Sequence, residues 1–539
     1  MAIKQPADRP AYPLTWVAGI ASITLGAGLG ELTAGVLAPE SSPFAVVGDA
    51  LVDAAPSWAK DAAIALFGTA DKVALFVGIA IVAVALAALA GWLQSRTPPW
   101  GLVVVGAFGA TGVVAAMTRA DAGPFAWVPS LVAGVVAALA LHLLTRLLSP
   151  AARASRAGAP SVVSQGTSAT AAATAATPAT ADQNPDRRTF FVWAGAATAA
   201  GVLATIAGSA VRAGSRTVSA VRQAIGLPAA AVPAAAVSTS AELAISGLAP
   251  VITPNTEFYR IDTALIVPQV DTSGWSLRIH GMVKQEVTIT WDDLVALPLE
   301  ESYTTLSCVS NSVGGDLIGN AKWLGYPIRE LLARAEPTAD ADMVLSQSID
   351  GFTASTPLSV LTDDRDSILA IGMNDEPLPI EHGFPVRMVV PGLYGYVSAT
   401  KWVTELKVTT FEQDKAYWST RGWSELGPIK LQSRIDVPTR NQSVPAGETV
   451  IAGVAWQPHV GVSKVEVQID GGEWVETTLA TAISDDTWVQ WSMPWTATSG
   501  SHTISCRATN VNGETQTDAI APPAPDGATG WQQISINVA

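Results

Sequence analysis

The chain has 539 residues, of which 49% are hydrophobic and only 14% are charged, and its formal net charge is −15. This length accommodates two or three domains, and the apolar excess is too large for one water-soluble body. The acidic charge excludes nucleic-acid binding, because an acidic surface repels a polyanion and no basic patch offsets that repulsion.

The apolar excess lies in the first third of the chain, in runs about as long as a helix needs to cross a bilayer. We expect four crossings in a membrane region over 1–150 and a fifth at 190–211. The individual runs cover about 14–37, 72–94, 101–119, 126–148 and 190–211. Glu31, inside the first run, is interpreted as a helix-end residue near the membrane interface.

Positive residues flank these runs unevenly. Lys4 and Arg9 precede the first run, and Arg187 and Arg188 precede the fifth. Loops rich in Lys and Arg stay in the cytoplasm. Five crossings from a cytoplasmic N-terminus predict a multi-pass protein of the cell membrane, embedded in the lipid bilayer, with its C-terminal half outside the cytoplasm.

Residues 151–189 form an Ala/Thr/Ser/Pro-rich segment with too few large apolar side chains to build a core, so a disordered linker is expected there. It ends with Arg187 and Arg188, directly before two phenylalanines, and this pattern resembles a twin-arginine export signal placed inside the chain. The alternative is a pair of ordinary positive-inside arginines. Export in the folded state would suit a domain that is loaded with a cofactor in the cytoplasm.

A second Ala/Pro-rich segment, 212–250, is expected to tether the remaining chain. Over 251–437 strand-like runs alternate with helical ones, for example 275–279 and then 291–297, as is typical of an α+β domain. Strand patterns alone fill 438–539 and predict an immunoglobulin-like β-sandwich. The predicted fold is therefore multi-domain: an α-helical membrane bundle, an α+β domain and a C-terminal β-sandwich.

The two cysteines lie in different predicted domains, so a disulfide between them is not expected. Cys506 is interpreted as a small buried hydrophobic residue in a strand. Cys308 ends a strand-like run and is followed by the segment Gly319-Asn320-Ala321-Lys322-Trp323-Leu324-Gly325. This arrangement resembles the sulfite-oxidase superfamily, in which such a cysteine supplies the one protein thiolate bound to molybdenum. The resemblance implies Cys308 as metal ligand and catalytic residue, beside the two sulfurs of a molybdopterin dithiolene.

A second match to this superfamily begins with His382-Gly383-Phe384-Pro385-Val386-Arg387 and continues to Ser398-Ala399-Thr400-Lys401-Trp402. In the family these segments bind the phosphate and the ring edges of the pterin. Guanidinium, ammonium and hydroxyl groups are suited to a buried anion. The cofactor-binding residues that the resemblance implies here are His382, Arg387, Ser398, Thr400 and Lys401.

A third match, the segment from Thr253 through Asn255 and Tyr259 to Arg260, is similar to the family's entry segment. There an Asn and an aromatic residue touch the cofactor and an Arg faces the metal. This similarity implies Asn255 and Tyr259 as cofactor contacts and Arg260 as a catalytic residue. The sandwich resembles the family's C-terminal dimerisation domain, which implies a homodimer.

Two departures from the family bear on the substrate. Sulfite oxidases place arginines soon after the cysteine to hold a dianion, whereas 311–316 are neutral to acidic here. Their Asp-Gly-Tyr-x-Ala-Ser segment reads Asp350-Gly351-Phe352 in this chain, so a phenol that would bind an oxyanion is missing. We therefore expect oxygen-atom transfer at molybdenum with a small-molecule substrate, either a sulfoxide or a small oxyanion.

His142 is the only histidine in the predicted spans and no Cys-x-x-Cys-His motif occurs, so no haem is expected. A separate electron carrier or a quinone-linked membrane protein would then exchange the electrons. Two alternatives need no metal: an extracytoplasmic binding or adhesion module on a membrane anchor, and a transporter with a sensing domain. The first leaves the ordered motifs unexplained, and the second requires polar residues inside the spans, where they are scarce.

Overall fold

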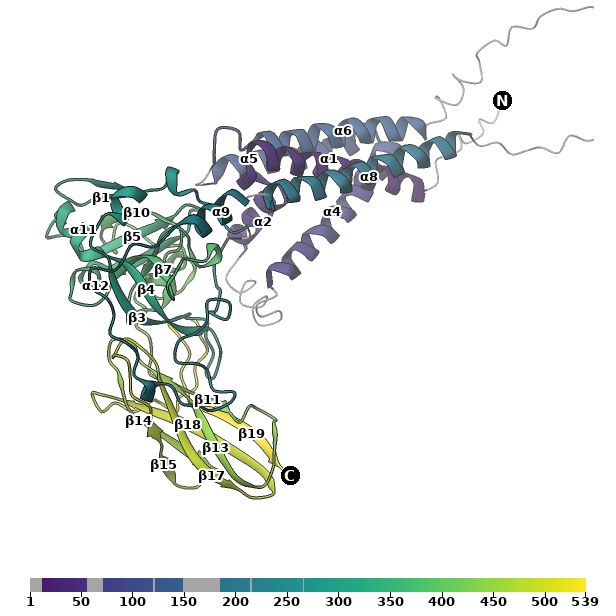
Figure 1. Cartoon of the computed structure of the whole chain (residues 1–539). Coiled ribbons are helices and arrows are strands. Elements are labelled where there is room, and N and C mark those ends of the chain that lie inside the picture. The colour runs from purple at the N-terminus through teal and green to yellow at the C-terminus, as the bar shows by residue number, and fades with distance from the viewer. Residues whose placement is uncertain (1–11, 56–70, 120–121, 149–184, 214–215, 265) are drawn as a thin grey trace, which may run out of the picture. The chain divides into compact units, whose positions relative to one another are not determined.

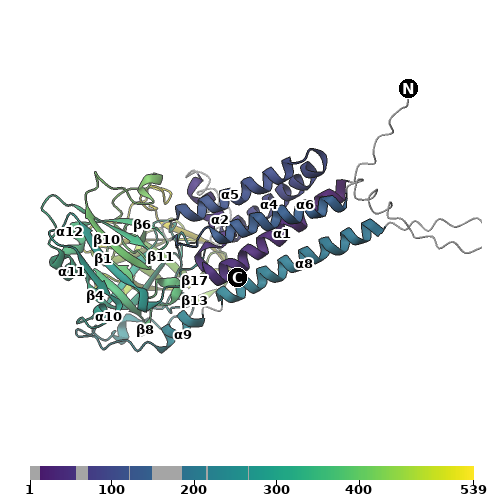
Figure 2. The same ribbon diagram turned by 90° about the horizontal axis from the view of Figure 1, so that it is seen from above.

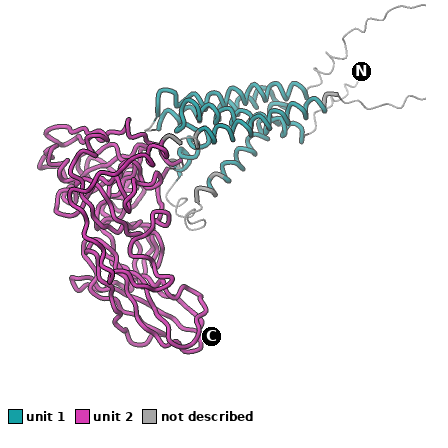
Figure 3. Tube along the Cα trace, viewed as in Figure 1, with its two compact units in different colours: residues 1–215 teal, residues 216–539 magenta. Residues whose placement is uncertain are grey.

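The computed structural model describes residues 12–55, 71–119, 122–148, 185–213, 216–264 and 266–539. The chain divides into two compact units, residues 1–215 and 216–539 (Figure 3). Most of the expected disordered linker, up to residue 184, lies outside the described residues.

Unit 1 is a bundle of helices (Figures 1 and 2). Among its described residues five helices are long and apolar enough to cross a membrane, which confirms the five predicted spans. They are α1 (Tyr12–Leu37), α4 (Asp71–Arg96), α5 (Trp100–Thr118), α6 (Val128–Leu147) and α8 (Pro185–Ala213), with the shorter η1 (Pro39–Ser41) and α2 (Pro43–Ala54) after α1. Because α8 begins at Pro185, the residues 185–189 expected in the linker are helical instead.

Glycines let α1 approach three neighbouring helices closely. A Cβ atom on Gly19 would collide with the backbone of α4, one on Gly26 with α6 and one on Gly28 with α8. In a membrane, where the hydrophobic effect does not drive helix association, such small residues allow close van der Waals packing. Helix α1 is therefore the centre of the bundle.

Glu31 lies in the last two turns of α1 and is buried, and its proximity to the membrane interface stays a prediction. Its carboxylate accepts hydrogen bonds from the Ser42 hydroxyl (2.6 Å) and the Phe44 backbone N–H (3.3 Å). Both donors belong to the start of α2, where the helix dipole is positive. Glu31 therefore caps α2 and fixes it against α1.

Two sheets and three short helices form the first part of unit 2, which confirms the predicted α+β domain (Figure 1). One sheet has the order β2-β1-β10-β5-β6, and the other has the order β3-β4-β7-β8 with β9 added to β7. The strands are β1 (Ser276–Gly281), β2 (Val287–Thr290), β3 (Glu300–Ser307), β4 (Ile318–Pro327), β5 (Met343–Ser348), β6 (Thr353–Pro357), β7 (Ile368–Met373), β8 (Glu376–Pro377), β9 (Arg387–Val389) and β10 (Val403–Thr409). The helices are α10 (Trp291–Val295), α11 (Ile328–Ala335) and α12 (Leu358–Thr362).

The second part of unit 2 is the predicted immunoglobulin-like sandwich, with sheets β11-β13-β17-β16 and β12-β19-β18-β14-β15. Its strands are β11 (Gln432–Val437), β12 (Ser443–Val444), β13 (Gly447–Trp456), β14 (Val462–Ile469), β15 (Trp474–Glu476), β16 (Thr478–Leu479), β17 (Val489–Ala497), β18 (Gly500–Asn510) and β19 (Gln532–Val538). Since β11 pairs with β13, the sandwich begins at Gln432, before the expected boundary at 438. Cys506 is a buried free thiol in β18.

Residues 216–250, here called the strap, pack along unit 2 instead of hanging from it. Helix α9 (Arg216–Ala224) is fixed by Arg222, which donates to the backbone carbonyls of Pro377 (2.7 Å) and Leu378 (2.8 Å). Further along, the strap pairs with β3, because the Glu301 N–H donates to the Val232 carbonyl (2.9 Å). The Ala/Pro-rich composition therefore reflects an extended, bound segment.

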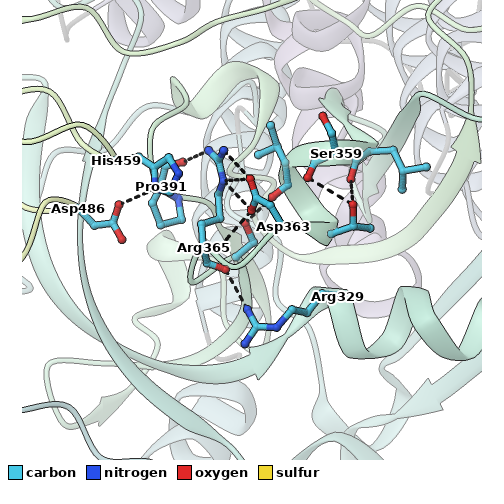
Figure 4. Close-up of polar contacts among 11 residues, drawn as sticks. Arg329, Ser359, Asp363, Arg365, Pro391, His459 and Asp486 are labelled. Carbon is cyan, nitrogen blue, oxygen red and sulfur yellow. Dashed lines mark hydrogen bonds and ion pairs between the residues drawn. The ribbon is translucent and has the colours of Figure 1, made fainter. Parts of the chain in front are cut away.

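Charged groups gather where the α+β domain meets the sandwich (Figure 4). Arg365 pairs with the Asp363 carboxylate (2.7 Å) and donates to the Pro391 carbonyl (3.0 Å), while His459 of the sandwich lies 3.2 Å from the Asp486 carboxylate. Burial raises the pKa of Asp486, and the nearby His459 and Arg365 oppose that rise. Charges of the α+β domain thus affect the ionisation of a carboxylate in the sandwich.

Candidate active site

Cys308 lies at the end of β3, in the loop that leads back into β4. Its backbone N–H donates to the Leu317 carbonyl (2.9 Å), and this bond closes the base of the loop. The Sγ atom is buried and accepts a bond from the Ser310 N–H (3.4 Å). Burial raises the pKa of the Cys308 thiol, although the Ser310 N–H opposes this effect. A bound cation would shift it the other way, since a coordinating thiol is deprotonated outright.

Two phenols lie close enough to Cys308 for its charge to affect them. Burial is the main cause of the raised pKa of Tyr259 and of Tyr394. The pKa of Tyr394 reaches about 12, and a thiolate at Cys308 would raise both pKa values further. Tyr259 stacks on Phe258 with ring centroids 5.3 Å apart. Both phenols therefore stay protonated at neutral pH.

Arg387, from β9, is a buried guanidinium without a counter-ion. It donates to the backbone carbonyls of His382 (3.1 Å) and Met388 (3.3 Å) and lies over the Trp323 ring at 5.2 Å. Within the part of the chain that the structure describes, no carboxylate forms an ion pair with it. Burial lowers its pKa to about 10. Because an uncompensated buried charge is costly, this position is suited to an anionic ligand.

Two further cations stand beside it and share one carboxylate. Lys401 Nζ lies 2.8 Å from Asp262 Oδ2, and Arg260 Nε lies 2.9 Å from the same oxygen. Burial lowers the pKa of Lys401 to about 8, although Asp262 opposes that shift. We call Arg260, Arg387 and Lys401 the cation cluster. The structure places Arg260 here, and its predicted catalytic role stays a prediction. Asp262 was missed from sequence, although it follows Arg260 in the entry segment.

His382 is buried between these cations and is neutral. Its Nε2 lies 3.3 Å from the Asn255 carbonyl oxygen, which can only accept, so Nε2 carries the proton. Burial is the main cause that lowers the pKa of His382 to about 3, and the charges of Arg387 and Lys401 add to it. The ring therefore offers Nδ1 as an acceptor without adding a charge.

Three other predicted cofactor contacts have side chains bonded within the protein. The Asn255 side-chain amide is bonded on both sides to the loop that follows β7. The Ser398 hydroxyl donates to the Tyr394 carbonyl (3.0 Å), and the Thr400 hydroxyl lies 2.7 Å from Ser346 Oγ. These residues hold the walls of the site together, and their contact with the cofactor stays a prediction.

The arrangement fits a molybdopterin. Cys308 offers a single thiolate to the metal, which suits a group that brings two sulfurs of its own. The cation cluster carries more positive than negative charge, which suits the phosphate of the pterin. Arg387 lies on Trp323 of the segment that follows Cys308, so two of the sequence motifs meet in space.

A family model and sequence relatives support this fit. Residues 264–418 match the family described as oxidoreductase molybdopterin binding domain, and residues 432–505 match the bacterial Ig domain. Rat mitochondrial sulfite oxidase is 29% identical over 323 residues, covering 50% of this chain and 58% of that protein. The uncharacterized oxidoreductase YuiH of Bacillus subtilis is 30% identical over 172 residues, covering 32% of this chain and 83% of that protein. The structure of the sulfane dehydrogenase SoxCD from Paracoccus pantotrophus aligns with 22% identity and a TM-score of 0.47. The alignment covers 55% of this chain and 85% of the SoxCD chain.

The site and these matches define the class of protein: a molybdopterin-binding oxidoreductase. The chain belongs to the sulfite oxidase family, and it adds five helices that can cross a membrane and a C-terminal immunoglobulin-like domain. It spans 58% of the length of rat sulfite oxidase and 49% of the length of the mouse protein.

Lys401 predicts a pH dependence of cofactor retention. Its pKa of about 8 lies below the ordinary value of 10.5, so the apoprotein gains stability as the pH rises from about 8 to 10.5. A bound anion favours the ammonium form, so affinity should fall above pH 8, by at most about tenfold per pH unit. Pterin retained after dilution at pH 7 and pH 9.5 measures this loss. In Lys401→Met the loss should disappear, and an equal loss in that variant would contradict the assignment.

Proposed function

We propose that this chain transfers an oxygen atom between water and a small-molecule substrate at a molybdenum bound by Cys308, on the outer face of the cytoplasmic membrane. The observation that carries the proposal is the buried Cys308 thiol at the end of β3. When bound, the molybdenum cofactor supplies the two-electron chemistry. Cys308 would bind the metal, and the cation cluster with neutral His382 would hold the pterin phosphate.

A neutral sulfoxide is the substrate class that the surroundings of Cys308 favour. The loop after it, 309–317, contains Asp316 and no Lys or Arg, so it offers no cation to a dianion. Tyr259, whose phenol interacts electrostatically with Cys308, would instead donate a hydrogen bond to a neutral S=O oxygen. In the overall reaction the S=O bond breaks, and the sulfoxide takes up two electrons and two protons to yield a thioether and water. A small oxyanion is the second candidate.

The electrons would come from a separate carrier or a quinone-linked membrane protein rather than from a haem bound by this chain. Lys and Arg residues before the first and fifth spans support an outer location, because such loops stay in the cytoplasm. Arg187 and Arg188 would serve as the export signal for the folded domain, and a homodimer through the sandwich is proposed from the family resemblance. Protease added to intact spheroplasts should digest unit 2; protection of unit 2 would reverse the orientation.

The substrate assignment is tested on full-length protein from a molybdate-supplied host. We expect one molybdenum and one pterin per chain, with reduction of methionine sulfoxide by reduced viologen. Sulfite oxidation with ferricyanide should be at least about a hundredfold poorer in kcat/KM, since it lacks the charge pairing that a dianion needs. Efficient sulfite oxidation would overturn the sulfoxide proposal. A folded chain without molybdenum and pterin would overturn the proposed function as a whole.

A further inference from the structure

The C-terminal sandwich contacts the strand that leads to Cys308. Within its sheet β3 pairs only with β4, and the strap covers the start of its other edge at Glu301. Near its end, the Thr305 N–H donates to the Asp486 carbonyl (3.0 Å), and the Trp488 N–H donates to the Thr305 hydroxyl (2.8 Å). Both partners belong to the sandwich. Beyond the strap, this edge of β3 is thus bonded to the sandwich just before the cysteine.

Thr305 is the centre of a buried polar network. Its hydroxyl also donates to the Asn320 side-chain oxygen (3.1 Å) on β4. The Asn320 amide and the Trp488 indole N–H both donate to the Val251 carbonyl, at 2.8 and 2.9 Å. The Thr305 hydroxyl therefore donates one hydrogen bond within the α+β domain and accepts one from the sandwich. Such fully bonded buried networks hold one arrangement, because each missing partner is costly.

The sandwich also holds the other side of the cysteine. Arg434 of β11 donates to the Gly315 carbonyl (3.0 Å) in the loop that follows Cys308. Its guanidinium is fixed by Asp436 (2.6 Å), with side chains only 11% and 9% exposed, and it lies over the Trp488 ring at 5.9 Å. Gly314, at a φ of +74°, leaves the space that the Gln532 side chain occupies. The two contact points are thus connected through Arg434 and Trp488.

We propose that the sandwich positions the thiolate: Arg434 and Trp488 hold the two ends of the Cys308 loop, residues 305–315, so that Sγ is in place before the metal arrives. The inference rests on the proposed role of Cys308 as ligand. It follows from the loop itself, in which Ser312 is exposed and Sγ has one weak bond, to Ser310. Groups that orient a metal ligand contribute strongly to metal affinity.

Arg434→Gln is the test, with Arg507→Gln as its matched control. Arg507 pairs with Glu466 (3.0 Å) and lies over Trp474 (4.2 Å), so it has the same kind of environment within the sandwich alone. In full-length apoprotein, alkylation of Cys308 by iodoacetamide, located by peptide mass, should be roughly tenfold faster in Arg434→Gln, since a hydrogen bond from a charged group is lost. Arg507→Gln should react like wild type, and Arg434→Lys should restore part of the protection.

In protein loaded with molybdenum, Arg434→Gln should also shift the molybdenum(V) EPR spectrum, which a general loss of stability would leave unchanged. Wild-type alkylation and an unchanged spectrum in Arg434→Gln would overturn the inference, as would equal acceleration in Arg507→Gln. If Arg434→Gln does not fold, Thr305→Val removes the bond to Trp488 without removing a charge, and Thr305→Ser retains it. A wild-type chain without molybdenum would refute the ligand role of Cys308, while the alkylation rates would still test the positioning of the loop.

Discussion

Cys308→Ser is expected to lower molybdenum-dependent turnover by more than about a hundredfold. Changes to groups that only orient a metal ligand already cost about 10- to 100-fold, and this substitution removes the ligand itself. A serine hydroxyl is a hard donor that stays protonated, so it replaces a soft thiolate poorly. Turnover with a sulfoxide, molybdenum and pterin per chain, and the absorption band from sulfur to molybdenum would be measured together. Pterin content should fall much less than turnover, because the cation cluster remains.

Cys506→Ser is the matched control for that experiment. Cys506 is also buried and free, but it lies in β18 of the sandwich beside Ser433. Its substitution should leave both turnover and the absorption band unchanged. Wild-type turnover in Cys308→Ser would show that this thiol is not the metal ligand.

Arg387→Met should have opposite effects on the apoprotein and on cofactor binding. Burial lowers the pKa of Arg387 from 12.5 to about 10, which corresponds to a penalty of about 3 kcal/mol on the charged form. Methionine keeps apolar contact with Trp323 and loses two hydrogen bonds to carbonyls, at about 1 kcal/mol each. The apoprotein should therefore be about 1 kcal/mol more stable. Pterin affinity should fall about a hundredfold, because charged hydrogen bonds to phosphate are lost.

Lys401→Met provides the contrast, because Lys401 pairs with a carboxylate, whereas among the described residues none pairs with Arg387. Without Lys401, buried Asp262 loses one counter-ion and keeps Arg260. This loss offsets the relief of removing a buried ammonium, so the apoprotein should gain less stability than with Arg387→Met, or none. Thermal unfolding of the two apoproteins, followed by tryptophan fluorescence, measures the difference in stability between Arg387→Met and Lys401→Met. Destabilisation of the apoprotein by Arg387→Met would mean that the guanidinium is structural and not kept for an anion.

The fold classes could be predicted from sequence because their signals are local. A run of apolar residues identifies a span wherever it packs, and alternation identifies a strand. The exact limits were less accessible: β11 belongs to the sandwich through its pairing with β13, and the Ala/Pro-rich strap is ordered through its pairing with β3. Both depend on a partner strand that the local pattern does not contain.

The candidate site was likewise predictable only in part from the sequence. Its chemistry was present in the sequence as motifs: Cys308 at a strand end, and Arg387 and Lys401 in one segment. Their neighbours were not, since Asp262 pairs with Lys401 across 139 positions of the chain, and Trp488 reaches Thr305 across 183. Sequence by itself therefore determined the membrane bundle, the two domain types and the residues of the motifs, because these follow from composition, periodicity and residue order. Only the tertiary structure decided which charges are paired and which domain holds the loop, because these contacts join segments far apart in the chain.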